Sequence, residues 1–384
     1  MSTGIPFNKP YMTGRELWLI SQAHARGHLS GDGAFTKQCH RWLEEHVGCR
    51  KALLTHSCTA ALEMSALLLN LEPGDEVIMP SFTFVSTANA FVLRGAVPVF
   101  VDIRPDTLNI DEKLIEAAIT SRTRAICVVH YAGVACAMDE ILAVAERHGL
   151  TVIEDAAQAI FSSYKGRRLG GIGALAALSF HETKNVISGE GGALLVNDPC
   201  LEERAEIIRE KGTNRSKFFR GQVDKYTWVD VGSSYLPGEI IAAFLAAQLE
   251  QGEAITRTRL SLWDTYHAWA EPYEVGGVVR RPVVPVECTH NAHMYYLLLP
   301  SLEARMRFIE SMREAGVGTV FHYIPLHSSP AGQRFGRTSG GMEITDSVSG
   351  RLVRLPLYVG LEDQQEAVID AASLALDSLQ VEFG

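Results

Sequence analysis

The stretch Leu178-Ser179-Phe180-His181-Glu182-Thr183-Lys184-Asn185, followed by Gly189-Glu190-Gly191-Gly192, places a lysine between an apolar run and a glycine-rich return. Upstream, Val152-Ile153-Glu154-Asp155-Ala156-Ala157-Gln158 places an acid at the end of another apolar run. A lysine and an Asp so placed can hold a pyridoxal phosphate (PLP) ring at both ends. The lysine forms a Schiff base with the aldehyde, and the Asp pairs with the pyridinium nitrogen. These stretches therefore predict a PLP site.

Short apolar runs alternate with helical patterns between residues 51 and 198. The runs are apolar on successive residues, as expected for strands that are covered on both faces. Alternating strands and helices predict an α/β fold with a mainly parallel sheet and right-handed crossovers. The predicted strands are 52–55, 76–79, 97–103, 125–131, 151–154, 176–180 and 193–196, and the predicted helices are 59–70, 85–94, 111–121 and 138–148.

The C-terminal third has a different pattern. Apolar residues recur at helical spacing over 240–249, and the helix is expected to continue toward residue 270 with a break at Gly252. Beyond it lie an apolar run at 294–299, a helix and a last helix near 363–379. We expect a large PLP-binding α/β domain at 1–250, with an N-terminal extended segment, and a small α+β domain at 251–384. The middle helix is expected to bury Leu302, Met306, Ile309 and Met312.

The composition limits the classes of function. A formal net charge of −10 argues against general affinity for nucleic acid or for an anionic membrane. The seven cysteines are an odd number without a C-x-x-C pair, which is typical of free thiols in a reducing compartment. No signal-peptide pattern is visible, and no apolar run approaches the ~20 residues that span a bilayer. We expect a cytoplasmic protein without a nucleic-acid or membrane partner.

The lysine and the acid each have a second interpretation. Lys184 must be neutral to attack a carbonyl, and burial beside positive charge lowers a lysine pKa enough for that. Its freed amine can then move protons between substrate and cofactor. Taken alone, Lys184 would more often be an ordinary surface lysine, as most lysines are, and the surrounding pattern reverses that. Asp155 could instead cap a helix that starts near Ala156, and Gln158 either reaches the phenolic oxygen of PLP or faces solvent.

A phosphate site is expected where Ser57-Cys58-Thr59 joins a predicted strand to a predicted helix. Free N–H groups and hydroxyls at a helix N-terminus bind phosphate, although these residues could also serve only as caps. Ser179 would add a hydroxyl to the same phosphate. Phe84 either stacks on the cofactor ring or belongs to the core.

Two other segments have open interpretations. The segment 211–225 either binds an anionic ligand or is a solvated basic loop; its cations are Lys211, Arg215, Lys217, Arg220 and Lys225. The segment 322–327, with His322 and His327 at its ends, either lines the site or closes a strand with a turn. The 13 histidines include no pair that suggests a metal site.

A set of motifs, in order along the chain, resembles the DegT/DnrJ/EryC1/StrS family of PLP-dependent sugar aminotransferases. That family has the aspartate aminotransferase fold, fold type I. The resemblance covers nearly the whole chain, and the ordered set is specific although each motif alone is weak. The motifs are Ser57-Cys58-Thr59-Ala60-Ala61-Leu62, Pro80-Ser81-Phe82-Thr83-Phe84, Glu154-Asp155-Ala156-Ala157-Gln158, Ser179-Phe180-His181-x-x-Lys184-Asn185, Gly189-Glu190-Gly191-Gly192 and His322-Tyr323-x-Pro325-Leu326-His327.

The resemblance implies that Lys184 is the catalytic lysine and that Asp155 pairs with the pyridinium nitrogen. Many members have Gly at the position of Cys58 and supply an Asn from the second subunit, where this chain has Ser234. Cys58 is therefore expected to act through its N–H, and Ser234 to replace the Asn. The other implied cofactor contacts are Thr59 and Ser179 at the phosphate, Gln158 at the phenolic oxygen and Phe84 on the ring.

Within the family, the stretches 29–33, 86–96, 130–136 and 211–216 are most similar to members that aminate C4 of dTDP-4-keto-6-deoxy-D-glucose with L-glutamate. Their product enters surface polysaccharides such as enterobacterial common antigen. The resemblance also implies a homodimer with shared sites and a ping-pong reaction. The expected substrate contacts are Arg215, His322 and His327, and no metal is expected.

Three alternatives stay open. The same chemistry could act on another keto-sugar nucleotide. A PLP-dependent sugar dehydratase could share the scaffold, but dehydratases of the family have His at the lysine position, so Lys184 argues against one. A non-catalytic binding protein could keep the fold, and an unchanged visible spectrum on adding glutamate would favour it.

Overall fold

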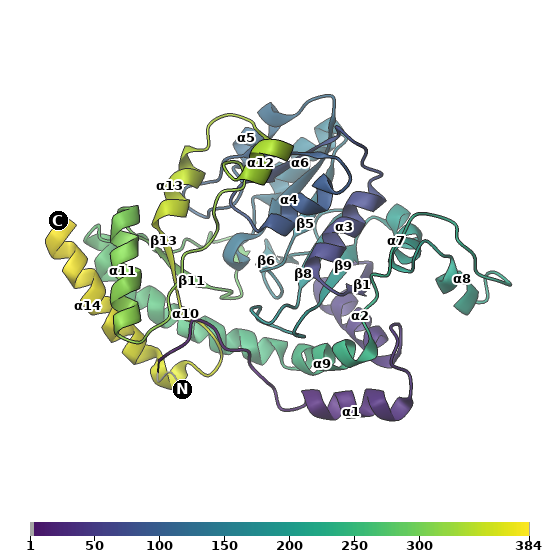
Figure 1. Cartoon of the computed structure of the whole chain (residues 1–384), viewed down its shortest axis with the longest axis horizontal. Coiled ribbons are helices and arrows are strands. Elements are labelled where there is room, and N and C mark those ends of the chain that lie inside the picture. The colour runs from purple at the N-terminus through teal and green to yellow at the C-terminus, as the bar shows by residue number, and fades with distance from the viewer. Residues whose placement is uncertain (1–3, 384) are drawn as a thin grey trace.

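The computed structural model describes residues 4–383, and its centre is an eight-stranded sheet in the order β1-β9-β8-β5-β4-β2-β3-β12 (Figure 1). The structure confirms the predicted α/β class and the predicted order of these strands and helices along the chain, with some ends shifted by about two residues. The strands are β1 (Lys51–Thr55), β2 (Glu76–Pro80), β3 (Val97–Val101), β4 (Thr123–Val129), β5 (Thr151–Asp155), β8 (Leu175–Ser179), β9 (Gly192–Val196) and β12 (Arg337–Thr338).

The sheet is mainly parallel, and among its described strands only β9 runs against the others. Leu194 of β9 pairs with Leu53 of β1 and with Ala177 of β8, both antiparallel. The glycine-rich return produces this reversal, because Phe180 donates to the Gly191 carbonyl at 2.9 Å directly after β8 ends. The return therefore brings the segment that carries Lys184 back over the carboxyl end of the sheet.

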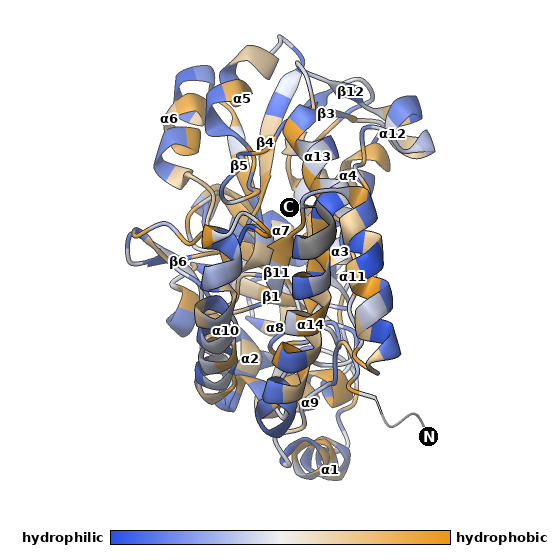
Figure 2. Ribbon diagram, turned by 90° about the vertical axis from the view of Figure 1, so that its left-hand side faces the viewer, coloured by the Kyte–Doolittle hydropathy of each residue, from blue (hydrophilic) through white to orange (hydrophobic). Residues whose placement is uncertain are grey.

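Helices cover both faces of the sheet, as the successive apolar residues in its strands require. One face packs on α2 (Ala34–Val47), α5 (Glu112–Ala118), α6 (Met138–His148) and α9 (Glu239–Glu250). The other packs on α3 (Cys58–Leu68), α4 (Val85–Val92) and α7 (Glu202–Arg209). In Figure 2 the central strands are largely hydrophobic, whereas α5 and α6 also carry hydrophilic turns toward the outside.

The N-terminal segment includes two helices that the sequence patterns did not predict, α1 (Glu16–Arg26) and α2. The N-terminus of α2 has no side-chain cap of its own; instead the Glu239 carboxylate accepts from the N–H groups of Gly33 at 3.1 Å and Phe35 at 2.8 Å. The predicted break at Gly252 is confirmed, since α9 ends at Glu250 and α10 (Gly252–Val275) begins there. Figure 1 shows α9 and α10 running beneath the sheet toward the C-terminal elements.

The C-terminal elements have their own core around a two-stranded antiparallel sheet. That sheet pairs β11 (Tyr295–Leu298) with β13 (Leu352–Leu355). The surrounding helices are α10, α11 (Leu302–Glu314) and α14 (Gln365–Phe383), and the shorter α12 (Pro330–Phe335) and α13 (Glu343–Arg351) lie between α11 and β13 along the chain.

The predicted buried face of α11 was right for Met312 and Ile309 and wrong for Leu302 and Met306. Leu302 is 50% and Met306 61% exposed, whereas Ala304, Phe308 and Met312 are buried. The face that includes Phe308 and Met312 belongs to the C-terminal core, in which α11 packs against α14.

The division into domains at 1–250 and 251–384 stays a prediction. Residues from beyond 251 also pack on the large sheet. The strand β12 pairs with Val99 and Phe100 of β3, and Leu326 and Met342 join the core on the face covered by α3, α4 and α7. A small sheet likewise joins β10 (Cys288–Thr289) to β6 (Ser163–Tyr164) and β7 (Arg167–Arg168). These contacts place segments from both parts of the chain beside one cavity.

Within residues 4–383, no helix is both long enough and apolar enough to cross a membrane. The same residues contain no group of three or more His, Cys, Asp or Glu side chains that could hold a metal ion.

Candidate functional site

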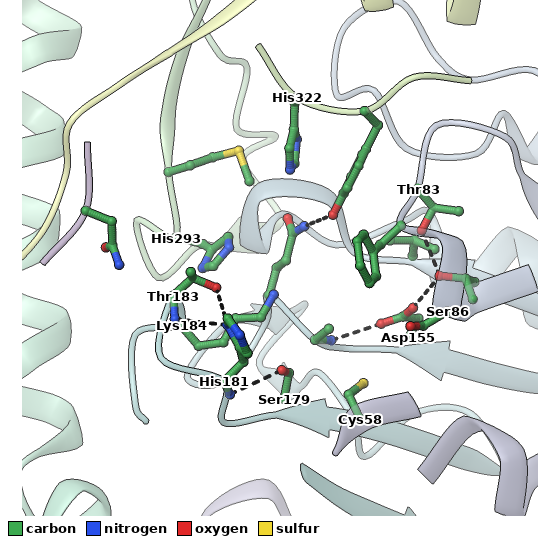
Figure 3. Close-up of a pocket in the computed structure, with 18 of the residues that line it drawn as sticks. Cys58, Thr83, Ser86, Asp155, Ser179, His181, Thr183, Lys184, His293 and His322 are labelled. Atoms are coloured by element: carbon green, nitrogen blue, oxygen red, sulfur yellow. Dashed lines mark hydrogen bonds between the residues drawn. The ribbon is translucent and has the colours of Figure 1, made fainter. Parts of the chain in front are cut away.

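A cavity of about 640 Å³ opens at the carboxyl ends of the parallel strands, within the range of small-molecule sites. Parallel α/β sheets bind ligands at this edge. Several of the predicted site residues line the cavity together (Figure 3). They are Cys58, Thr59, Phe84, Asp155, Gln158, Ser179, Lys184 and His322.

Lys184 lies in the short segment between β8 and β9, with its N–H bonded to the His181 carbonyl at 2.9 Å. Its amine has no acid or hydrogen-bond partner among residues 4–383. Burial lowers the pKa of this amine, and the nearby Arg354 guanidinium lowers it further, against the opposing effects of Cys58 and Asp155. The position thus favours the neutral form of an amine that faces the cavity, and the neutral form is the one that attacks a carbonyl.

Asp155 ends β5 and is 5% exposed. The Thr87 hydroxyl donates to Oδ2 at 2.7 Å, and the Ala157 N–H donates to Oδ1 at 3.2 Å. Thr87 is bonded in turn to the Thr83 hydroxyl at 2.8 Å. Burial raises the pKa of Asp155, and the Thr87 hydrogen bond and Lys184 oppose that rise. The residues after Asp155 form turns, so it caps no helix.

The N-terminus of α3 forms another part of the cavity wall. Ser57 caps the helix, since its hydroxyl accepts from the Ala60 N–H at 3.1 Å. The N–H groups of Cys58 and Thr59 have no acceptor among the described residues, so capping and anion binding are compatible here. Burial raises the pKa of the Cys58 thiol well above its ordinary value. A neutral thiol is a poor partner for an anion, which leaves the N–H as the useful group.

A close approach of backbone segments fixes this wall. A side chain at Gly192 would place its Cβ 2.3 Å from the Ser57 carbonyl carbon. Only glycine therefore lets β9 pass against the start of α3. The glycine-rich return thus positions the N-terminus of α3 as well as the lysine segment.

Phe84 and Gln158 lie on different walls. Phe84 is 57% exposed, as expected for a ring that has the cavity on one side. The Gln158 side chain is fixed, because Oε1 accepts from the Ala132 N–H at 2.7 Å and Nε2 donates to the Tyr323 hydroxyl at 2.8 Å. Its second Nε2 hydrogen remains for a ligand.

His322 projects into the cavity from the C-terminal part of the chain (Figure 3). Its ring stacks on Tyr323 at 3.6 Å, and its Nδ1 lies 2.7 Å from the Tyr131 hydroxyl. Burial, with help from Arg354 and Lys184, lowers the pKa of His322 well below its ordinary value. The buried Tyr131 hydroxyl has no other partner within residues 4–383, so it donates to Nδ1 and leaves the N–H on Nε2.

Three predicted site residues lie away from this cavity. His327 is bonded to the Ser81 hydroxyl at 2.8 Å and paired with Asp346 at 3.3 Å. Ser234 forms an isolated antiparallel β-bridge, through backbone atoms, with Glu210. Arg215 begins α8 (Arg215–Phe219), which protrudes from the body in Figure 1. Its guanidinium lies 3.7 Å from Glu210 and over the ring of Phe219.

Several cavity residues carried no sequence signal that would have found them. Phe7 and Asn8 arrive from the N-terminal segment, which crosses the C-terminal part through a bridge between Ile5 and Val317. Thr87 lies in the stretch 86–96, which suggested a substrate but gave no role to this hydroxyl. The others that matter here are Arg259, His293, Tyr323 and Arg354, which come from the C-terminal part of the chain. Only Tyr323 lay within a quoted motif.

The cavity fits PLP. The amine of Lys184 can join its aldehyde, the carboxylate of Asp155 can pair with its ring nitrogen, and the free N–H groups of Cys58 and Thr59 can bind its phosphate. The buried Asp155 has no cation bonded to it within residues 4–383, so a protonated ring nitrogen would supply one.

Comparisons with known proteins agree with this geometry. A model of the DegT/DnrJ/EryC1/StrS aminotransferase family matches residues 10–373. The uncharacterized protein MJ1066 of Methanocaldococcus jannaschii is 36% identical over 348 residues, 89% of each chain. The spore coat polysaccharide biosynthesis protein SpsC of Bacillus subtilis is 34% identical over 379 residues, 96% of each chain. The PLP form of the putative sugar aminotransferase Spr1654 from Streptococcus pneumoniae superposes with a TM-score of 0.89 at 26% identity, over 98% of this chain and 99% of that one.

Proposed function

Because the chain belongs to the DegT/DnrJ/EryC1/StrS aminotransferase family, whose cofactor is PLP, we propose that it moves the amino group of L-glutamate to C4 of dTDP-4-keto-6-deoxy-D-glucose. The products are dTDP-4-amino-4,6-dideoxy-D-galactose and 2-oxoglutarate, the reaction of a dTDP-4-amino-4,6-dideoxygalactose transaminase. The observation that carries the aminotransferase step is the buried amine of Lys184, which has no hydrogen-bond or acid partner among residues 4–383 and lines the same cavity as Asp155. The sugar is proposed from the resemblance of stretches such as 86–96 and 130–136.

Different residues of the chain have different roles in this reaction. When bound, PLP supplies an aldehyde and an electron sink for the carbon that carries the amino group. Lys184 would move the proton between that carbon and the cofactor, and burial lowers its pKa in the direction that helps its amine to accept as well as donate a proton. Asp155 accepts a hydrogen bond from Thr87 that favours its ionised form, and the ionised carboxylate would keep the ring nitrogen protonated. The N–H groups at the start of α3 hold the phosphate and so orient the ring.

We place two of the predicted residues in a homodimer. Ser234 and Arg215 lie outside the cavity of their own chain, and α8 protrudes as an arm with exposed Phe219 and Trp228 beside it. An exposed arm with apolar side chains suits contact with a second copy. We propose that this arm brings Ser234 to the cofactor phosphate of the partner subunit and Arg215 to the diphosphate of its sugar nucleotide, since Arg suits phosphate. We also propose a cytoplasmic location, where nucleotide sugars are made.

A second candidate is amination of another keto-sugar nucleotide. The names of the relatives favour keeping it, because SpsC is a spore coat polysaccharide biosynthesis protein and Spr1654 a putative sugar aminotransferase. Both candidates use the same lysine, acid and phosphate site. They differ only in which keto carbon and which nucleotide the cavity accepts.

The test is incubation of the purified protein with PLP, L-glutamate and dTDP-4-keto-6-deoxy-D-glucose. Mass spectrometry should show an amino sugar nucleotide, and proton NMR should show an axial amine at C4. Lys184→Ala is the control and should give no product while it keeps the fold. Formation of PLP-dependent spectra without amination of this sugar would contradict the proposed acceptor and favour another keto-sugar nucleotide.

Arg215→Ala tests the arm. It should raise KM for the nucleotide sugar far more than KM for glutamate. Equal effects on both substrates would contradict the assignment.

A further inference from the structure

The side chain of His293 lines the cavity from the segment that precedes β11 (Figure 3). Its Nδ1 lies 2.9 Å from Oδ1 of Asn185, the residue that follows Lys184 in the chain. This contact joins the imidazole to the immediate neighbour of the reacting lysine. The other ring nitrogen, Nε2, has no hydrogen-bond partner among residues 4–383. It is therefore the ring atom that remains for a ligand.

The orientation of the Asn185 amide decides which nitrogen of His293 carries the proton. Nδ2 of Asn185 donates to the Asn291 carbonyl at 2.8 Å. If the amide were reversed, its oxygen would face that carbonyl, and neither oxygen can donate a hydrogen bond. Oδ1 of Asn185 therefore faces the ring. Because this oxygen only accepts, the proton of the neutral ring lies on Nδ1.

Further hydrogen bonds hold this arrangement in place. Asn291 donates from Nδ2 to the carbonyls of Gln158 and Ile160, both at 2.8 Å. Asn185 and Asn291 are buried, with exposed fractions of 5% and 0%. The carbonyl that orients Asn185 is thus anchored to a second wall of the cavity, and the imidazole of His293 has a fixed partner.

The neighbours of His293 favour its neutral state. Arg259 donates from Nη2 to the His293 carbonyl at 2.7 Å, and Lys184 lines the same cavity. Within residues 4–383 no carboxylate is bonded to the ring. Burial lowers the pKa of His293 well below its ordinary value, and Lys184 and Arg259 act in the same direction. Nε2 therefore presents a lone pair, which accepts a hydrogen bond and cannot donate one.

An acceptor at this place selects among the possible ligands. The carboxylates of L-glutamate only accept, so they do not match it, and a cavity acceptor without a donor is costly. A sugar hydroxyl can donate. In the sugar of the proposed function, C3 carries a hydroxyl and is bonded directly to C4, the carbon that receives the amino group. The other neighbour of C4, which is C5, carries no hydroxyl.

We propose that Nε2 of His293 accepts a hydrogen bond from the C3 hydroxyl of the 4-keto sugar, and so selects sugars that carry this hydroxyl. The inference rests on the proposed function, which supplies the sugar and the position of its keto group. C4 must reach Lys184 for the proton to move, and the residue next to Lys184 holds His293. The hydroxyl nearest to C4 is therefore the one that meets the ring.

The test compares dTDP-4-keto-6-deoxy-D-glucose with its 3-deoxy analogue. Wild type should favour the 3-hydroxy sugar in kcat/KM by about 3- to 10-fold, the range for one hydrogen bond between neutral groups. In His293→Leu, which has no acceptor, the preference should vanish while the glutamate half-reaction is unchanged. His293→Gln, whose amide oxygen can accept, should recover part of the preference. A preference that persists in His293→Leu would overturn the proposal.

His290→Leu is the matched control. His290 lies three residues upstream in the same segment and is also partly buried, but it does not line the cavity. Its replacement should leave the preference between the two sugars and the glutamate half-reaction unchanged. Thermal melting of each holoenzyme separates loss of recognition from loss of the fold.

Nitrogen NMR of the histidine rings gives a readout that is independent of turnover. In the wild-type holoenzyme, His293 should show a protonated Nδ1 and an unprotonated Nε2, the reverse of His322. The spectrum of His293→Gln identifies the signals by their loss. A proton on Nε2 of His293 would overturn the proposal.

The two sugars also separate this inference from the function on which it rests. Equal kcat/KM values for both sugars in the wild type would overturn the role of His293 and leave the proposed reaction intact, because the 4-amino sugar still forms. If glutamate reacts but neither sugar is aminated, the proposed acceptor is wrong and the C3 contact falls with it.

Discussion

The hydroxyl of Thr87 donates to Asp155 and favours its ionised form, and its removal is a sharp test of the site. The hydroxyl donates to Oδ2 at 2.7 Å within a fully buried pair of threonines. Thr87→Val keeps the shape and removes the donor. A hydrogen bond to a charged group contributes about 1.5–3 kcal/mol. The ionised form of Asp155 should lose roughly that much stabilisation.

The sign of the effect follows from the direction of the pKa. Burial already raises the pKa of Asp155, and Thr87 opposes the rise, so the variant should have a still higher pKa. Activity needs the ionised carboxylate and is lost as pH falls through that pKa. The acid limb of kcat/KM should therefore move to higher pH, and kcat/KM on that limb should fall by about 10- to 100-fold.

The assay is the pH dependence of the glutamate half-reaction, followed by the visible spectrum of the cofactor. Thr87→Ser keeps the donor and should restore the wild-type limb. Thr83→Val removes the hydroxyl that is bonded to Thr87 and does not touch Asp155, so it should shift the acid limb less. An acid limb that stays in place in Thr87→Val, with the fold intact by thermal melting, would refute the reasoning.

Three further perturbations have defined outcomes. Lys184→Met should raise the Tm of the apoprotein near neutral pH, because folding lowers the pKa of the lysine and so costs stability wherever the unfolded lysine is charged. The difference in Tm between variant and wild type should shrink toward alkaline pH. A difference that stays constant with pH would count against burial of the amine as the cause. Glu154→Gln should cost about 3 kcal/mol or more in urea unfolding, because the buried carboxylate accepts from His130 at 2.9 Å and from backbone N–H groups. Although burial opposes it, these bonds lower the pKa of Glu154, so the loss should be present above about pH 4.5 and fade as pH falls; a pH-independent loss would argue for packing. Tyr131→Phe should remove the hydrogen bond that fixes His322 as the Nε2–H tautomer. Nitrogen NMR of the ring detects that change, and an unchanged spectrum would contradict the assignment of Tyr131 as the donor.

Much of the fold followed from local patterns. The apolar runs predicted the strands because a strand buried on both faces needs apolar residues in succession. Gly252 marked the break between two helices because glycine is a poor residue for a helix interior. In contrast, the buried face of α11 depended on Phe308 meeting α14, a contact between segments far apart in the sequence. Helical spacing alone gives several candidate faces and does not say which one has a partner.

The candidate site divides in the same way. Lys184, Asp155, Cys58 and Ser179 lie at the ends of strands or at a helix start, and strand ends of a parallel sheet meet at one edge. Their roles as ligands of the cofactor stay predictions, but their meeting in one cavity was foreseeable. His327 shows the limit, since a histidine in the same motif as His322 turns away to bond Ser81.

The sequence by itself determined the order of strands and helices, the glycine-rich return and the lysine and acid at strand ends. These depend on residues near one another in the chain. Only the tertiary structure decided that Thr87 donates to Asp155, that Tyr131 contacts His322 and that Arg354 lines the same cavity as Lys184. Each of these contacts joins segments separated by dozens to nearly two hundred residues. Local propensity does not encode such distances; they follow from how the C-terminal elements pack across the edge of the sheet.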